Sequence, residues 1–288
     1  YDLTSPEETI ERLKDANIAI TCKVVINKNI IDSCRMLNMI CAAATGVNHI
    51  DVEYANSKGI IVKNVAGYST NSVAQATFSL ILELTNHISY YDNYVKSGEY
   101  SKNRMFTHMG PTIIELHGKT LGIIGLGAIG QKVALIGKSF GMNVCYYSTS
   151  GKNYNNKYRR IELDELLRNS DIISIHAPLN DNTRNLITLK ELREMKPTAF
   201  LINAGRGGII NENDLAQALD DNIIAGAGID VFSKEPIETT NPLMNIKNKS
   251  KIVFSPHSAW TSLEARIELI KGIVKNIKEF VDNKKVNA

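Results

Sequence analysis

The chain has 288 residues, of which 43% are hydrophobic. This length is close to the upper limit for a single hydrophobic core and therefore favours two domains. Its 33 basic and 30 acidic side chains leave a net charge of +3 without a basic run, so nucleic acid is not expected as a main partner. No apolar run approaches the ~20 residues that span a bilayer, and no charged-then-apolar leader opens the chain, so neither membrane insertion nor secretion is expected.

The first part of the chain alternates helices with short apolar strands. Ser5 as a cap, Pro6 at the first helical position and Glu8 three residues after the cap predict a helix over residues 6–16. Buried parallel strands are predicted at the apolar stretches 18–20, 39–44 and 60–62, which end in turns. A long helix should then begin at Asn71 or Ser72, since apolar residues recur at helical spacing up to Ile88, and this helix should join the two domains.

A second alternating series follows and contains six predicted strands. They lie at residues 119–124, 144–147, 172–175, 199–202, 225–229 and 252–254, with helical stretches between them. Strands that are apolar throughout are typical of a doubly wound parallel sheet, because crossover helices cover both of its faces. The amphipathic segment 261–281 should pack back on the first domain.

A glycine-rich turn lies between the first strand of this series and the helix predicted over 131–140. Gly125 permits a tight bend, Gly127 lets a pyrophosphate approach the backbone, and Gly130 lets helix and strand pack closely. The amides at the start of the helix would then face the phosphates. This strand, turn and helix predict a dinucleotide site.

The identity of the dinucleotide depends on the end of the next strand. An acidic residue is expected there to bind the ribose hydroxyls, but the chain has Ser148, 18 residues after Gly130, followed by a loop that contains Lys152. Hydroxyls and a lysine suit a ribose 2′-phosphate, which an acidic side chain would repel. Lys152 is equally compatible with a plain solvated loop, so the sequence leaves NAD and NADP open.

Three loops that follow predicted strands each carry a polar group suited to reducing a carbonyl. Arg206, Glu235 and His257 follow successive strands, and ligands of open parallel sheets bind at the carboxyl ends of strands. Histidine can give a proton to a developing alkoxide, a carboxylate can orient its ring, and an arginine fork matches a carboxylate. Each residue alone is more often structural than functional, but together with the turn they predict hydride transfer to a 2-oxo acid.

The remaining histidines and the cysteines carry no comparable pattern. No two of the six histidines have ligand spacing, so no metal site is expected, although His176 should lie beside the cofactor. The four cysteines follow no CxxC or metal-like spacing, which favours the reduced cytoplasm.

Over essentially its whole length the chain resembles the D-isomer-specific 2-hydroxyacid dehydrogenases. The resemblance rests on ordered motifs at residues 44–51, 71–75, 125–130, 176–179, 203–208, 230–236 and 255–257. It implies an α/β fold of two domains, in which a doubly wound (Rossmann) cofactor domain at 94–261 is inserted in a flavodoxin-like substrate domain at 1–93 and 262–288, with the active site in the cleft. It also implies that the family's opening strand is missing ahead of Tyr1 and that a homodimer forms through the cofactor domain, with residues 91–114 as the arm.

The same resemblance assigns roles to individual residues. His257 is implied as acid and base, Glu235 as its partner, and Arg206 as the anchor of the substrate carboxylate and carbonyl, with the amides of Gly46 and Val47 also holding the carboxylate. The implied cofactor contacts, besides Gly125, Gly127 and Gly130, are Ala128, Ile129, Ser148, Ala177, Pro178, Thr183, Ala204 and Asp230, the last facing the nicotinamide amide.

Within the family, residues 67–70 and 257–260 look most like glycerate dehydrogenases, also called hydroxypyruvate reductases, but Trp260 is equally suited to packing.

Two other classes of function, a corepressor and a methyltransferase, remain to be compared with the dehydrogenase. The same fold serves in corepressors that sense dinucleotides without catalysis, although the chain lacks the long disordered tails that suit such a role. A methyltransferase with a similar turn leaves Arg206, Glu235 and His257 unexplained.

Overall fold

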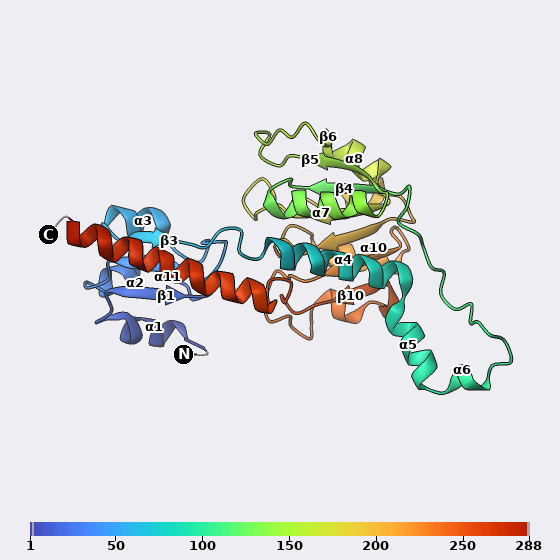
Figure 1. The fold of residues 1–288 in the computed structure, drawn as a ribbon, viewed down its shortest axis with the longest axis horizontal. Coiled ribbons are helices and arrows are strands. Elements are labelled where there is room, and N and C mark those ends of the chain that lie inside the picture. The colour runs from blue at the N-terminus through green and yellow to red at the C-terminus, as the bar shows by residue number, and fades with distance from the viewer. Residues whose placement is uncertain (2, 287–288) are drawn as a thin grey trace. The chain divides into compact units, whose positions relative to one another are not determined.

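The computed structural model describes residues 1 and 3–286, which form two compact units (Figure 1). The first unit consists of Tyr1–Ser69 and Thr261–Ala288, and the second of Thr70–Trp260. Within the described residues, no helix is long and apolar enough to cross a membrane.

The first unit is built on a three-stranded parallel sheet in the order β1-β2-β3. Its elements are α1 (Pro6–Leu13), β1 (Ile18–Thr21), α2 (Lys28–Ser33), β2 (Met39–Ala42), α3 (Val52–Ser57), β3 (Ile61–Lys63) and α11 (Leu263–Val286). The predicted capping box of α1 is present, since Ser5 Oγ accepts from the Glu8 amide and Glu8 accepts from the Ser5 amide. Asn276 ties α11 to the sheet region by donating to Asn64 O at 3.0 Å.

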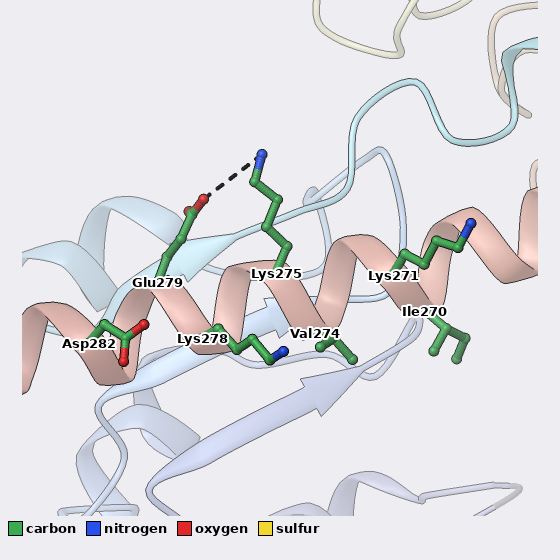
Figure 2. A pocket seen from close by; sticks show the side chains of 7 residues that line it. All are labelled: Ile270, Lys271, Val274, Lys275, Lys278, Glu279 and Asp282. Atoms are coloured by element: carbon green, nitrogen blue, oxygen red, sulfur yellow. Dashed lines mark ion pairs between the residues drawn. The ribbon is translucent and has the colours of Figure 1, made fainter.

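The outward side of α11 carries a shallow groove that is lined by this helix alone. Figure 2 shows its seven side chains, which are Ile270, Lys271, Val274, Lys275, Lys278, Glu279 and Asp282. Lys275 pairs weakly with Glu279 at 3.9 Å. The charged side chains of the groove all come from one helix and are exposed, so the groove does not form a candidate site.

The second unit contains a seven-stranded parallel sheet in the order β10-β9-β8-β7-β4-β5-β6. The strands are β4 (Thr120–Ile124), β5 (Asn143–Tyr147), β6 (Arg159–Arg160), β7 (Ile172–Ile175), β8 (Phe200–Asn203), β9 (Gly226–Ile229) and β10 (Ile252–Phe254). Six of them match the predicted series, and the doubly wound parallel sheet is confirmed. The prediction of six strands was wrong by one, because β6 is a two-residue edge strand of exposed arginines without an apolar signal.

Helices cover both faces of this sheet. Along β8, Phe200 and Ile202 belong to one hydrophobic cluster and Leu201 belongs to the other, as the alternation of side chains across a strand requires. The first cluster includes residues of α4 (Thr70–Asn86) and α7 (Ala128–Ser139), and the second includes residues of α8 (Leu163–Asn169), α9 (Leu189–Glu194) and α10 (Glu212–Asp220).

Helix α4 belongs to the second unit by its contacts, so the chain divides at residues 69–70 and not at 93–94, where we placed the first boundary. Its Leu80 and Leu84 pack against glycines of β9. A Cβ added to Gly228 would lie 2.9 Å from Leu80 Cβ, and a Cβ added to Gly226 would lie 3.3 Å from Leu84 Cδ2. The sequence shows that α4 is amphipathic, but it does not show which sheet the apolar side packs on.

The strand order places a topological switch point between β4 and β7. From β4 the chain proceeds outward through β5 and β6, and from β7 it proceeds in the opposite direction through β8, β9 and β10. The loops that leave the carboxyl ends of these two strands therefore diverge, and ligands of open parallel sheets bind in the crevice that results.

Beyond α4, the chain forms a projecting arm that returns to β4. Figure 1 shows α5 (Ile88–Lys96), α6 (Glu99–Lys102) and the following strand-free segment lying away from the sheet of the second unit. Two 3-10 helices, Pro242–Asn245 and Lys249–Lys251, complete the second unit between β9 and β10.

Candidate active site

The glycine turn joins β4 to α7 at the switch point, and its three glycines meet different surroundings. Gly125 has φ +92°, and a Cβ there would lie 2.8 Å from the Ala177 amide nitrogen. A Cβ on Gly130 would lie 2.3 Å from Gly125 O, whereas a Cβ on Gly127 would meet nothing within 4 Å. Two glycines thus serve the close packing of the turn itself, and Gly127 leaves open space where a ligand's phosphates can approach.

Helix α7 begins at the turn without a capping side chain. Gly127 is its N-cap residue, and no side chain accepts from the amides of the first turn. These amides and the positive end of the helix dipole form an anion site of the kind that binds a pyrophosphate. Ala128 is exposed and Ile129 is partly buried at this end of the helix.

Two buried polar atoms without hydrogen-bond partners flank the turn. Ser148 directly follows β5 and His176 directly follows β7, and these strands lie on either side of β4. Ser148 Oγ and His176 Nδ1 have no partner, while His176 Nε2 shares a hydrogen bond of 2.8 Å with Ser174 Oγ. Burial lowers the pKa of His176 to about 4, so this ring is neutral at physiological pH. Unpaired polar atoms beside an open turn fit the polar edges of a dinucleotide.

Arg206 lies in a tightly held loop after β8. Asn203 spans the loop, since its Nδ2 donates to Arg206 O at 2.9 Å and its Oδ1 accepts from the Gly205 amide at 3.1 Å. Gly207 packs so closely on the next loop that a Cβ there would lie 1.9 Å from Phe232 O. The loop that carries Arg206 is therefore fixed against the loop that carries Glu235.

His257 and Glu235 form a hydrogen-bonded pair between the loops that follow β10 and β9. His257 Nδ1 lies 2.7 Å from Glu235 Oε2 and 2.8 Å from Oε1, and both side chains are partly exposed at 22% and 26%. Glu235 Oε1 also accepts from the Phe232 amide at 3.1 Å. Because the carboxylate occupies Nδ1, it orients the ring, and Nε2 is the nitrogen that could exchange a proton with a bound molecule.

The side chain of Asp230 holds the loop of His257 in place through hydrogen bonds. Its buried carboxylate accepts from Ser255 Oγ at 2.5 Å and from the amides of Ser258 and Ala259 at 2.9 and 3.2 Å. The His257 amide donates to Asp230 O at 2.7 Å, and His257 has φ +52°. A left-handed conformation is unusual for histidine, and this set of hydrogen bonds maintains it.

The other predicted cofactor residues line the same edge of the sheet with different exposure. Pro178 is exposed, and Ala177 and Ala204 are buried beside the turn and after β8. Thr183 is fully buried, and its hydroxyl donates to Pro178 O at 2.6 Å and accepts from the Asn180 amide at 2.8 Å, so it shapes the loop after β7. Gly46 and Val47 lie in the first unit, in the loop directly after β2.

Sequence reasoning missed Glu212, a residue that orders the loop of Glu235. Its Oε1 accepts from the Ser233 amide at 2.6 Å and its Oε2 accepts from Asn241 Nδ2 at 2.7 Å. Glu212 begins α10, so the sequence suggested only an acidic first turn. Among the described residues, no three His, Cys, Asp or Glu side chains gather to hold a metal ion.

Comparison with known proteins assigns this combination of fold and site to one family. Residues 78–259 match the model described as "D-isomer specific 2-hydroxyacid dehydrogenase, NAD binding domain". The chain therefore belongs to this family, and it is an NAD(P)-dependent oxidoreductase of 2-hydroxy and 2-oxo acids. The family resemblance and the fold class predicted from the sequence are both confirmed.

Individual relatives cover nearly all of the chain. A hydroxypyruvate reductase of Blautia hydrogenotrophica is 38% identical over 99% of this chain and 88% of its own length. A glyoxylate reductase of Aeropyrum pernix is 40% identical over 90% of this chain and 78% of its own. Among solved structures, the acyclic imino acid reductase Bsp5, in complex with NADPH and D-Arg, is 34% identical with a TM-score of 0.88, over 99% of this chain and 89% of its own.

Proposed function

We propose that the chain reduces a small 2-oxo acid of the hydroxypyruvate or glyoxylate type to its D-2-hydroxy acid, with His257 as the acid and base. The hydrogen-bonded pair of His257 with Glu235 is the observation that supports this role best. The relatives named above add support, since they are a hydroxypyruvate reductase and a glyoxylate reductase. A corepressor without catalysis is not favoured, because the named relatives are enzymes.

The first step that these residues perform is to bind and orient the acid. Arg206 offers a fork whose geometry matches the substrate carboxylate, and its charge favours the polarised carbonyl oxygen. Its loop is held by Asn203 and by the contact of Gly207 with Phe232, so the backbone from which the fork extends is fixed before substrate binds. In this structure, Nη1 of Arg206 donates to Gly205 O at 2.8 Å. The assignment of the Gly46 and Val47 amides to the same carboxylate belongs to this proposal.

The second step is proton transfer at His257. When bound, the dinucleotide supplies the hydride, and the alkoxide that develops on the substrate needs a proton. With Nδ1 bonded to Glu235, Nε2 of His257 gives that proton in the reduction and takes it back in the oxidation. Asp230 maintains the backbone from which His257 extends, which keeps the ring aligned with its partner.

The proposal predicts turnover that is restricted to a class of acids. Purified protein should oxidise NADH or NADPH with hydroxypyruvate or glyoxylate, and less rapidly with pyruvate, in a spectrophotometric assay at 340 nm. A second series with methylamine added to each acid would show whether the chain prefers the imine, as the name of Bsp5 suggests for that protein. Tight dinucleotide binding without turnover on any acid or imine would refute the proposed function and favour a sensor.

We also propose that the protein is a homodimer and that residues 91–114 form its arm. The arm exposes large apolar side chains, with Phe106 at 90% and Met109 at 88%. It is nevertheless internally ordered, since His108 stacks on Tyr94 at 3.8 Å and shares a hydrogen bond of 2.9 Å with Tyr90. An ordered segment with exposed apolar residues is typical of an interface with another protein.

The dimer should dissociate when this apolar surface is made acidic. Light scattering after size exclusion should give twice the chain mass for the wild type and the chain mass for the double variant Phe106→Asp with Met109→Asp. Ile270→Asp on α11 is a matched control, because it places an acid on another exposed apolar residue, and it should remain dimeric. A wild-type monomer at micromolar concentration would contradict the proposal.

A cytoplasmic location is the third part of the proposal. All four cysteines are unpaired, and Cys34, Cys41 and Cys145 are buried. Burial raises the pKa of each of these three thiols, which keeps them protonated. Free thiols in these positions fit a reducing compartment.

A further inference from the structure

Lys23 lies directly beyond β1 in a conformation that lysine seldom adopts. The strand ends at Thr21, and Lys23 has φ +66°, in the left-handed region. A residue other than glycine or asparagine rarely persists there unless its surroundings hold it, and such residues concentrate at functional sites. The reaction steps proposed above give Lys23 no role.

Backbone hydrogen bonds join the loop after β1 to the loop after β2. The Ile26 amide donates to His49 O at 2.9 Å, and Ile26 O accepts from the Asp51 amide at 3.0 Å. Because the carboxyl ends of parallel strands share one edge of a sheet, Lys23 lies on the edge that carries the amides of residues 46–47. The loop of Lys23 is thus held beside the loop that is proposed to bind the substrate carboxylate.

Lys23 supplies the positive charge of this edge. It is the single charged side chain within residues 22–27 and 43–50, where His49 is the other titratable base. Burial lowers the pKa of His49 and the charge of Lys23 lowers it further, so this ring is neutral at physiological pH. The ammonium of Lys23 is therefore close enough to act electrostatically on the loop after β2.

Two buried polar atoms at the same edge are not engaged by the protein. The Oγ1 atom of Thr21, a residue that is 7% exposed, and Nε2 of His49 have no hydrogen-bond partner among the described residues. Buried polar atoms are nearly always hydrogen-bonded, so these two are left to bond water or a bound molecule. Together with an ammonium that has three donors, they suit a small polar molecule.

The substituent on the third carbon distinguishes the small 2-oxo acids from one another. Glyoxylate has no third carbon, pyruvate carries a methyl group there, and hydroxypyruvate carries a hydroxyl. In the first unit, the loops after β1 and β3 flank the loop after β2 that is proposed to hold the carboxylate. Lys23 is the charged donor of these flanking loops, since residues 64–69 after β3 contain no charged side chain.

We propose that Lys23 is a specificity-determining residue whose ammonium donates a hydrogen bond to the hydroxyl on the third carbon of hydroxypyruvate. The chain would then select 2-oxo acids that carry a hydrogen-bonding group on this carbon. This inference rests on the proposed function, because it adds a residue and a substrate class to the same site. A site built to bond a hydroxyl disfavours analogues that lack it, since they lose the hydrogen bond.

Steady-state kinetics of Lys23→Met tests the assignment. Methionine has a similar length but no charged donor, so the ratio of kcat/KM for hydroxypyruvate to that for glyoxylate should fall about tenfold, as expected from the loss of a hydrogen bond to a charged group. The ratio of hydroxypyruvate to pyruvate should fall as well, mainly through a higher KM for hydroxypyruvate. Neither ratio depends on the fraction of the variant that folds.

Two further variants serve as controls. Lys23→Arg restores a charged donor and should retain most of the preference for hydroxypyruvate. Lys14→Met removes an equal charge from the residue that caps α1, ahead of the amino end of β1, and should leave both ratios unchanged. Unchanged ratios in Lys23→Met, or an equal loss of kcat/KM with all three acids, would overturn the inference and leave the proposed function intact. A wild type that turns over none of the acids would contradict the proposed function itself.

Discussion

Replacement of His257 by asparagine should lower the turnover number for 2-oxo acid reduction by about 10²–10⁴-fold, the range that general acid catalysis contributes. Asparagine is the appropriate substitution because His257 has φ +52°, a conformation that asparagine adopts readily. The amide of the asparagine can also donate a hydrogen bond to Glu235, but it has no proton to give to a substrate in the way that an imidazolium does. The loop should therefore keep its shape while losing its proton donor.

The measurement must separate chemistry from binding. Steady-state reduction at saturating acid gives the turnover number, and isothermal titration gives the dissociation constant of the dinucleotide, which should stay within about twofold of the wild type. Glu235→Gln should also slow turnover, and the double variant should be no slower than His257→Asn alone, since the two side chains act as a unit. Turnover of His257→Asn within tenfold of the wild type would remove His257 from its proposed role.

Two alanine substitutions in the glycine turn should affect different properties, one mainly the free energy of unfolding and the other mainly the dinucleotide affinity. Gly130→Ala places a Cβ 2.3 Å from Gly125 O, a backbone atom that cannot move freely, so we expect a loss of about 1–3 kcal/mol in the free energy of unfolding. Gly127→Ala meets no protein atom within 4 Å, so its free energy of unfolding should fall by about 1 kcal/mol or less. The same methyl group projects into the space that the pyrophosphate needs, and dinucleotide affinity should fall about tenfold or more.

Urea denaturation of the ligand-free variants and titration with the dinucleotide distinguish the two effects. The pair is internally controlled, since both changes add one methyl group to the same turn. Unchanged dinucleotide affinity in Gly127→Ala would show that the backbone of this turn is not where the phosphates bind.

The sequence predicted the large sheet well because its strands are apolar over their whole length. Strands β7 and β10 have the predicted ends, β9 differs from the prediction by one residue at its start, and β8 is shifted by one residue at both ends. The exception is β6, whose Arg159 and Arg160 extend the edge of the sheet through backbone pairing with Cys145 and Tyr146. Nothing in the residue types of such an edge strand distinguishes it from a loop.

The candidate site was predictable to the extent that its residues follow strands. Arg206, Glu235 and His257 were identified from their positions after β8, β9 and β10. Some of the hydrogen bonds that support these residues were not predictable, because they join residues distant in the sequence, such as Glu212 with Ser233 and Asp230 with Ser258. Asp230 stays a predicted contact of the nicotinamide amide, and the sequence did not show that its carboxylate also accepts from the amides of Ser258 and Ala259. The expected domain boundary at residues 93–94 differs from the division at 69–70 for a similar reason. The sequence shows that α4 has an apolar face, but only the fold decides which sheet that face packs against.

The hydrogen bonds among the loops after β8, β9 and β10 also bear on how enzymes of this kind can diversify. The contact of Gly207 with Phe232, the Glu235 and His257 pair, and the bonds of Asp230 all lie within Thr70–Trp260. Under the proposed mechanism, the residues that move the proton therefore belong to one continuous segment of the chain. If the amides of Gly46 and Val47 bind the substrate carboxylate as proposed, substitutions around them should alter which acid is accepted and leave the hydrogen bonds between His257 and Glu235 unchanged. Chimeras that exchange the two segments between relatives should accordingly keep their chemistry and change their substrate range.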